Sequence, residues 1–249
     1  MYKQNPKPNN LIYGIHSVIE AIEAGQLIDK IMVQKGEQSD LLIKLSKLAK
    51  ANNYYQQQVP KEKLNKLYRG NHQGVIAFTS PIDFQPIDEV ISQTFEKGKT
   101  PFIVALDGVT DVKNFGAIVR TAHSAGVDAI MIPFKGSAAC NEDAIKTSAG
   151  ALFHIPICKV KLMRNSLKYL QNTGIQVISV TEKTGDSIFS HDYTLPTCLV
   201  LGAEDVGISA DILKISDKKG ALPMLGKVGS LNVSVAAGVT MYEVVKQRL

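Results

Sequence analysis

Arg120 is the first residue whose type suggests chemistry. The chain holds 24 Lys but only four Arg, and Arg120 lies within the small and apolar stretch NFGAIVRTAHSAG, residues 114–126. Lysine evidently supplies the surface charge, so an arginine here points to something that lysine cannot do. A planar guanidinium can hold a phosphate through two parallel hydrogen bonds. The plain alternative is a helix-surface arginine paired with an aspartate.

The same stretch predicts a helix that would position Arg120. Gly116 lies one turn before Arg120 on the same helix face, so we expect no side chain to block the strip beside the guanidinium. Asn114 stands near the expected start of the helix, where an N-cap role is the structural interpretation.

Apolar runs and helical patterns alternate through residues 100–249. This alternation predicts an α/β unit with a parallel sheet that is covered on both faces. The expected strands are FIVALD, AIMIPF, HIPICKV, IQVISVT, TCLVLG and ALPM. The expected helices start near Asn114, Asn141, Leu162, Ser209 and Ser230. Ligands of such sheets bind beyond the carboxyl ends of the strands, which selects three strand-to-helix junctions, LDGVTDVKNFG, LGAEDVGIS and LPMLGKVGSLN.

The N-terminal third predicts a second, smaller α/β unit over residues 1–80, with residues 81–99 as the linker and residues 100–249 as the larger domain. Residues 1–80 hold 11 Lys and Arg against 6 Asp and Glu, whereas residues 81–249 hold 17 of each kind. The whole net charge of +5 therefore belongs to the smaller unit. Such a charge indicates either a polyanion partner such as RNA or a solvated lysine-rich surface.

Several common classes of protein are disfavoured by what the sequence lacks. No two glycines are two residues apart, no P-loop is present, and neither H-E-x-x-H nor G-x-S-x-G occurs, which disfavours dinucleotide-binding enzymes, P-loop NTPases and common hydrolases. The cysteines are expected to be small core residues of a reduced protein, Cys140, Cys158 and Cys198. We expect no metal site, no membrane segment and, by default, a cytoplasmic location.

The three junctions, taken together, resemble the SpoU (TrmH) family of RNA ribose 2′-O-methyltransferases in the SPOUT class. The matching motifs are NFGAIVR (114–120), LGAEDVG (201–207) and LPMLG…SLNVS (222–234). IYGIHSVIEAI and HQGVIA in the first 80 residues are similar to the RNA-binding extension of that family. The resemblance thus covers nearly the whole chain, and three motifs at three strand ends make it specific.

The resemblance implies S-adenosyl-L-methionine as cofactor, a deep trefoil knot in the C-terminal domain and a homodimer formed through that domain. The catalytic positions that it implies are Arg120, Asn114, Glu204, Ser230 and Asn232. The implied cofactor-binding positions are Gly202, Leu222, Leu231, Leu201, Ala203 and Met224. The two-domain layout most resembles the family members that act on a guanosine of large-subunit (23S) ribosomal RNA. The alternatives are a tRNA target, or a non-catalytic RNA-binding factor of ribosome assembly.

Each of these positions also has a structural interpretation. Glu204 could be a solvated loop acid, Ser230 an N-cap, and Leu222 and Leu231 core residues. Gly202 and Gly207 would let the backbone approach a ligand closely. Arg120 could serve as a general base, or it could only position a phosphate, since a guanidinium gives up its proton with difficulty.

Overall fold

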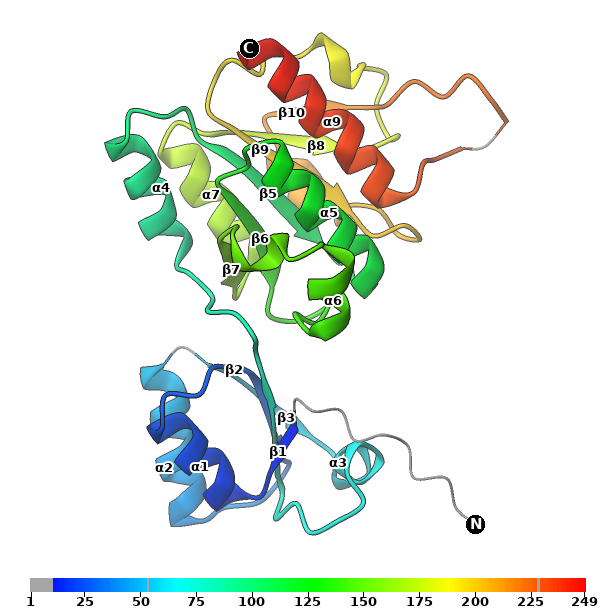
Figure 1. Cartoon of the computed structure of the whole chain (residues 1–249). Helices are drawn as coiled ribbons and strands as arrows, with labels where there is room; N and C mark the ends of the chain where they lie inside the picture. Colours follow the sequence, from blue (N-terminus) through cyan, green and yellow to red (C-terminus); the bar gives the residue numbers. More distant parts are fainter. Residues whose placement is uncertain (1–10, 53, 228) are drawn as a thin grey trace. The chain divides into compact units, whose positions relative to one another are not determined.

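The chain forms two compact units in a computed structural model that describes residues 11–52, 54–227 and 229–249. The units are Met1–Asp83 and Phe84–Leu249, and Figure 1 shows each as a sheet flanked by helices. None of the helices in the described part of the chain is long and apolar enough to cross a membrane.

The first unit is a four-stranded sheet in the order β1-β4-β2-β3. Only β2 and β3 run parallel; β4 is antiparallel to both β1 and β2. Buried residues of α1 and α2 pack with the sheet in one core cluster, and Leu64 of α3 belongs to another. The elements are β1 (Leu11–Tyr13), α1 (Ile15–Glu23), β2 (Ile28–Gln34), α2 (Asp40–Ala51), β3 (Tyr55–Val59), α3 (Lys61–Leu67) and β4 (Val75–Thr79).

The second unit confirms the predicted parallel sheet, with six strands in the order β10-β8-β9-β5-β6-β7. Every pairing in it is parallel. Its strands are β5 (Phe102–Asp107), β6 (Ala129–Pro133), β7 (Ile157–Val160), β8 (Gln176–Val180), β9 (Thr197–Gly202) and β10 (Lys218–Gly220). Its helices are α4 (Ile87–Glu96), α5 (Val112–Ser124), α6 (Glu142–Thr147), η1 (Ala151–Phe153), α7 (Met163–Asn172), η2 (Ile188–Ser190), α8 (Ala210–Ile215) and α9 (Val233–Arg248).

Residues 84–99 belong to the second unit and do not form the linker expected over residues 81–99. The division falls after Asp83, because the amphipathic helix α4 buries Val90 and Ile91 in the core of the second unit. The sixth strand also differs from the expected ALPM, since β10 occupies Lys218–Gly220 just before it.

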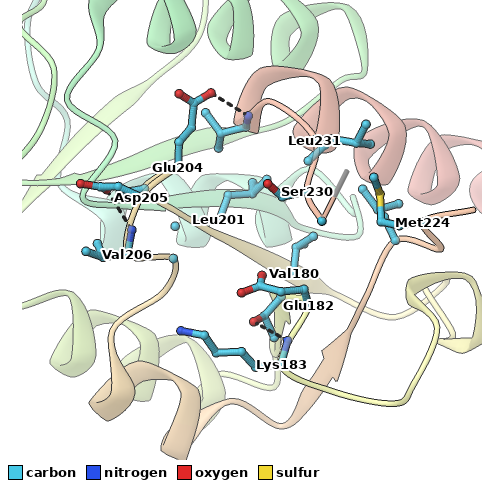
Figure 2. Close-up of a pocket in the computed structure, with 18 residues that line it drawn as sticks. Val180, Glu182, Lys183, Leu201, Glu204, Asp205, Val206, Met224, Ser230 and Leu231 are labelled. Carbon is cyan, nitrogen blue, oxygen red and sulfur yellow. Dashed lines mark hydrogen bonds between the residues drawn. The ribbon is translucent and has the colours of Figure 1, made fainter. Parts of the chain in front are cut away.

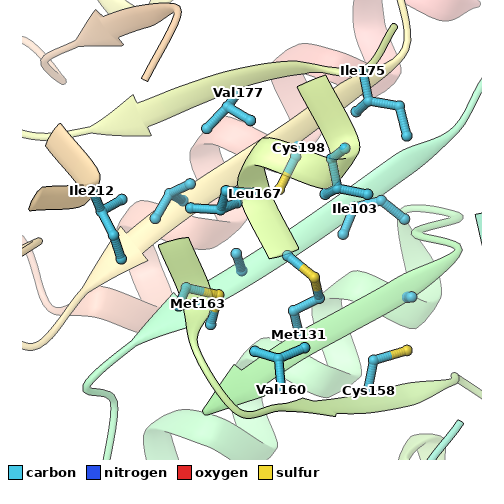
Figure 3. Packing of buried hydrophobic residues seen from close by; sticks show 14 of the residues in the cluster. Ile103, Met131, Cys158, Val160, Met163, Leu167, Ile175, Val177, Cys198 and Ile212 are labelled. Atoms are coloured by element: carbon cyan, nitrogen blue, oxygen red, sulfur yellow. The ribbon is translucent and has the colours of Figure 1, made fainter. Parts of the chain in front are cut away.

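One face of the large sheet packs against α4, α7 and α8 in a single apolar core (Figure 3). Cys158 and Cys198 lie in this core, and all three cysteines are buried, as predicted, and form no disulfide. Burial raises the pKa of the Cys158 thiol to about 12. Alternate strand residues point to the opposite face, where α5 and α9 pack side by side.

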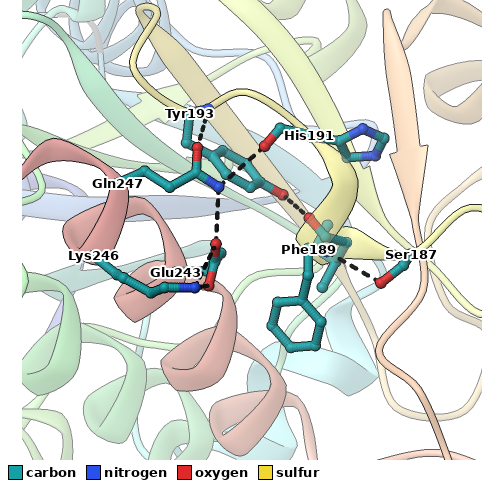
Figure 4. A network of polar contacts seen from close by, with 8 residues as sticks. Ser187, Phe189, His191, Tyr193, Glu243, Lys246 and Gln247 are labelled. Carbon is teal, nitrogen blue, oxygen red and sulfur yellow. Dashed lines mark hydrogen bonds and ion pairs between the residues drawn. The ribbon is translucent and has the colours of Figure 1, made fainter.

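The C-terminal end of α9 is tied to the rest of its unit by polar contacts. Arg248 donates from Nε to the Tyr193 carbonyl at 2.8 Å and from its terminal nitrogens to the carbonyls of Thr100, Pro101 and Leu195. In Figure 4, the Gln247 side chain accepts from the Tyr193 N–H at 2.9 Å and donates to the His191 carbonyl at 3.1 Å. These contacts hold α9 at one end, so its other end is presented at a defined place.

Gly116 does not leave an open strip beside Arg120, contrary to the expectation. A Cβ built on Gly116 would lie 2.7 Å from the Thr147 Cβ and 3.1 Å from the Ala144 carbonyl oxygen. The glycine is therefore required because α6 packs directly on α5.

This packing predicts that Gly116→Val destabilises the protein by about 2–3 kcal/mol, because the new side chain must displace the backbone of α6. Urea unfolding followed by circular dichroism measures the effect. Gly185→Val is the matched control, since nothing lies within 4 Å of a Cβ there, and it should change stability by less than about 0.5 kcal/mol. Equal effects at both positions would contradict the packing argument.

Candidate active site

A cavity of about 330 Å³ lies at the carboxyl ends of β8 and β9 and beside the start of α9 (Figure 2). All six residues expected to bind a cofactor line it, namely Leu201, Gly202, Ala203, Leu222, Met224 and Leu231. Glu204 and Ser230 line it as well. The structure therefore brings two of the three predicted junctions into one pocket.

Asn114 and Asn232 lie outside the cavity lining but are joined to it by hydrogen bonds. The Asn232 side-chain N–H₂ donates to the Asn114 Oδ1 at 3.0 Å and makes a short bond to the Glu204 Oε1. The same Glu204 oxygen accepts from the Val233 N–H at 3.3 Å. Three predicted catalytic residues, each from a different junction, thus meet in one network.

Glu204 is placed where its charge is favourable. It follows β9 and reaches the first N–H group of α9, where the helix dipole attracts a carboxylate. Glu204 is therefore not a loop acid that contacts only solvent, which was the alternative interpretation. The carboxylate holds the start of α9 against the end of β9.

The N-caps of the two site helices differ from those expected. Asp111, rather than Asn114, caps α5, because its carboxylate accepts from the Asn114 N–H at 2.8 Å. Asn232, rather than Ser230, caps α9 and accepts from the Ser234 N–H at 2.9 Å. The side chain of Asn114 is therefore not used for capping, which is the condition for a second role.

Gly202 also has a different reason for being glycine. A Cβ on Gly202 would lie 2.2 Å from the carbonyl carbon of Gly207. The group that approaches Gly202 closely is therefore the backbone of the following turn, and not a ligand. Gly207 has a φ of 71° and donates its N–H to the Ala203 carbonyl at 2.9 Å. The turn that carries Glu204 is thus compact, and its shape depends on both glycines.

Arg120 stands apart from this network. It is exposed on α5, six residues after Asn114, which is about 9 Å along the helix axis. Among the residues that the structure describes, no carboxylate forms a salt bridge with its guanidinium. The ion pair with an aspartate, which was the alternative for Arg120, is not formed there.

Part of the cavity wall was not predicted from the sequence. The cavity is also lined by Val180, the last residue of β8, and by Thr181, Glu182 and Lys183, which follow it. The alternation of apolar runs and helical patterns could have indicated these residues. It predicts β8 as another parallel strand, and the carboxyl end of β8 lies at the same edge of the sheet as that of β9. In the described ranges there is no cluster of His, Cys, Asp or Glu that could hold a metal ion.

Comparison with known proteins gives matches over nearly the whole chain. A family model described as the SpoU rRNA Methylase family matches residues 101–242, and one described as RNA 2′-O ribose methyltransferase substrate binding matches residues 11–85. A protein of Staphylococcus saprophyticus described as a TrmH family tRNA/rRNA methyltransferase is 35% identical over 238 residues, which are 96% of each chain.

Solved structures give the same picture of the fold. An AdoMet-bound rRNA methyltransferase from Sinorhizobium meliloti superposes with a TM-score of 0.62 at 22% identity, over 96% of this chain and 88% of that one. The TrmH/SpoU tRNA-modifying enzyme of A. aeolicus is 32% identical, with a TM-score of 0.55, and covers 65% of this chain and 83% of its own.

The network predicts a specific cost for Asn232→Asp. Aspartate caps a helix as well as asparagine does, so the variant keeps the cap but replaces the N–H₂ donor by a carboxylate facing Glu204. We expect a loss of about 1–2 kcal/mol in unfolding free energy at pH 8, measured by urea titration.

The loss should shrink as the pH falls to 5. In the folded variant, repulsion between two facing carboxylates favours the protonated form of one of them. The folded state is therefore destabilised at high pH, where both are charged, and less so at low pH, where one is protonated. Asn141→Asp, at the N-cap of α6, is the matched control and should be nearly neutral at both pH values. A pH-independent loss at residue 232 would count against the network.

Proposed function

The chain belongs to the SpoU methylase family, and from that premise we propose that it transfers the methyl group of S-adenosyl-L-methionine to a ribose 2′-hydroxyl of RNA. The single observation that carries the proposal is the network of Asn114, Glu204 and Asn232 beside a cavity lined by all six expected cofactor residues. Residues from three separate junctions are thereby assembled around one pocket.

The residues of the cavity fit S-adenosyl-L-methionine. Its volume of about 330 Å³ lies within the range of small-molecule pockets, about 300–1,000 Å³. Leu201, Leu222 and Leu231 offer apolar surface for an adenine, and Glu204 and Asp205 supply negative charge for a cationic cofactor. When bound, the cofactor supplies an electrophilic methyl group on a sulfonium.

The chain's own residues then have separate tasks. Asn232 fixes the carboxylate of Glu204 and the side chain of Asn114, so that these groups are oriented before the substrate arrives. Asn114, whose side chain is not used for capping, is proposed to contact the substrate ribose. Ser230 lines the cavity at the approach to α9 and is proposed to contact the same substrate.

Arg120 is proposed to bind an RNA phosphate next to the target ribose. Its exposed guanidinium lacks a carboxylate partner in the described chain, and it does not line the cofactor cavity. A bidentate grip on a phosphate would orient the ribose and stabilise negative charge on its oxygen. This positioning role is the one that we propose, in preference to general-base catalysis.

The first unit is proposed to bind the RNA. It carries the excess positive charge of the chain, and it matches the model for 2′-O ribose methyltransferase substrate binding. Counterion release from RNA would then contribute to affinity. We propose a guanosine of large-subunit ribosomal RNA as the target, in the cytoplasm, with tRNA as the second candidate because relatives are described as acting on either class.

We also propose that the second unit forms a homodimer and contains a trefoil knot. Three exposed apolar side chains, Val235, Val239 and Tyr242, recur at intervals of four and three residues on α9, which makes an apolar stripe typical of an interface. Val244 of the same helix is buried in the core and does not belong to this stripe. The described residues between β10 and α9, of which Leu222, Met224 and Leu231 line the cavity, would belong to the knotted segment.

The first test of this function is Arg120→Ala. We expect methyl transfer to fall by at least about 100-fold, as for loss of a charge-stabilising donor, while S-adenosyl-L-methionine binds as before. The measurement is nucleoside mass spectrometry after incubation with unmodified rRNA or tRNA. Arg164→Ala, exposed on α7, should leave activity unchanged. Full turnover by the Arg120 variant would refute the assigned role, and no 2′-O-methylnucleoside from the unaltered protein would refute the function.

The second test removes residues 1–83, the first unit. RNA affinity should fall, and its dependence on salt should become shallower, because fewer phosphates are neutralised. Cofactor affinity should stay the same, since the cavity lies wholly in the second unit. A salt titration of RNA binding checks this, and identical slopes for both proteins would contradict the charge argument.

The third test is Val239→Asp on the apolar stripe. A charge at the centre of an apolar interface is costly, so we expect the dimer to dissociate into monomers in size-exclusion chromatography with light scattering. Ile43→Asp, which replaces an exposed apolar residue of the first unit, should leave the mass unchanged. An unchanged mass for the Val239 variant would place the interface elsewhere.

A further inference from the structure

Two neighbouring residues of opposite charge, Glu182 and Lys183, line the cavity in a segment outside the three motifs. They follow β8, and both side chains are exposed. Neither has a role in the methyl transfer proposed above, so their presence in the pocket wall requires its own explanation.

The turn that carries the pair is anchored at its base. The Thr181 N–H donates to the Gly220 carbonyl at 3.0 Å, which extends the pairing of β8 with β10. The Thr181 side chain is buried, and its hydroxyl oxygen accepts from the Lys183 N–H at 3.2 Å. The backbone of the pair is therefore fixed at the carboxyl end of β8, a strand with neighbours on both sides.

The Lys183 ammonium lies beside the turn that follows β9. A Cβ built on Gly207 would be 3.7 Å from the Lys183 Nζ, and Figure 2 shows the ammonium end of Lys183 on the side of Val206. Because Gly207 has no side chain, the ammonium and the turn lie close together.

The charges of Glu182 and Lys183 are not satisfied within the described chain. No salt bridge or side-chain hydrogen bond joins them to each other or to another described residue. The other two acids of the lining are engaged, Glu204 with Asn232 and Val233, and Asp205 with the Val206 N–H at 2.9 Å. Two free and opposite charges thus face one pocket, and Lys183 is the only cation in its described lining.

We propose that Glu182 and Lys183 bind the amino-acid end of S-adenosyl-L-methionine, Lys183 holding the α-carboxylate and Glu182 the α-ammonium. This inference rests on the proposed function, since it names a subsite of the same cavity. A carboxylate entering a mouth that carries three acids would be repelled without a cation beside it. The zwitterionic amino-acid end of the cofactor carries both charges, so its carboxylate can pair with Lys183 and its ammonium with Glu182.

The test compares two ligands that differ only in the carboxylate. Isothermal titration measures the affinities of S-adenosyl-L-methionine and of its decarboxylated form, which keeps the ammonium and the sulfonium. Lys183→Met should weaken the first ligand by about three- to tenfold, in line with a partly exposed ion pair, and leave the second unchanged. Glu182→Gln should weaken both ligands by a similar factor, because both keep the ammonium.

Two controls keep the result specific. Lys183→Arg retains the charge and should restore most of the affinity, whereas Lys168→Met removes an exposed lysine of α7 and should change neither affinity. The loss at Lys183→Met should also diminish at high salt, because ions screen an exposed pair.

Several outcomes overturn the inference. Lys183→Met could weaken both ligands equally or neither, or it could weaken RNA binding alone, which would assign Lys183 to a phosphate. Any of these, with normal cofactor binding by the unaltered protein, removes the subsite but leaves the proposed function standing. Failure of the unaltered protein to bind S-adenosyl-L-methionine removes both.

Discussion

The carboxamide of Asn232 is the interaction on which the rest of the site depends. Its N–H₂ group reaches Glu204 after β9 and Asn114 on α5, while its oxygen caps α9. One side chain therefore connects three segments, of which the outer two are 118 residues apart in the sequence. Asparagine suits this place because it offers two donors and an acceptor at once, which neither aspartate nor serine can do.

Asn232 can connect the three segments only because contacts outside the site hold each segment in place. The parallel sheet brings the carboxyl ends of β8 and β9 to one edge, and the contacts of Arg248 and Gln247 hold α9 at its far end. Gly116 lets α6 pack on α5 without a gap. Packing thus positions the segments of the site, and a few polar contacts fix the side chains within it, as is typical of preorganised sites.

Much of this could be predicted from the sequence, for identifiable reasons. Alternating apolar runs predicted the parallel sheet, and the rule for its carboxyl edge led to Glu204 and the residues around it. The cap of α9 was misplaced because Ser230 and Asn232 are both good caps, and only the backbone of the approach decides between them. Gly116 and Gly202 were assigned to ligands because a sequence does not show which neighbour would collide with a Cβ.

The account is tested most directly by a crystal structure of the protein with S-adenosylhomocysteine. The expected position of the nucleoside is between the 201–204 turn and the side chains of Leu222, Met224 and Leu231, with Asn232 still bonded to Glu204 and Asn114. The ligand bound at another place, or an Asn232 side chain turned away from Glu204 when the cavity is filled, would contradict it.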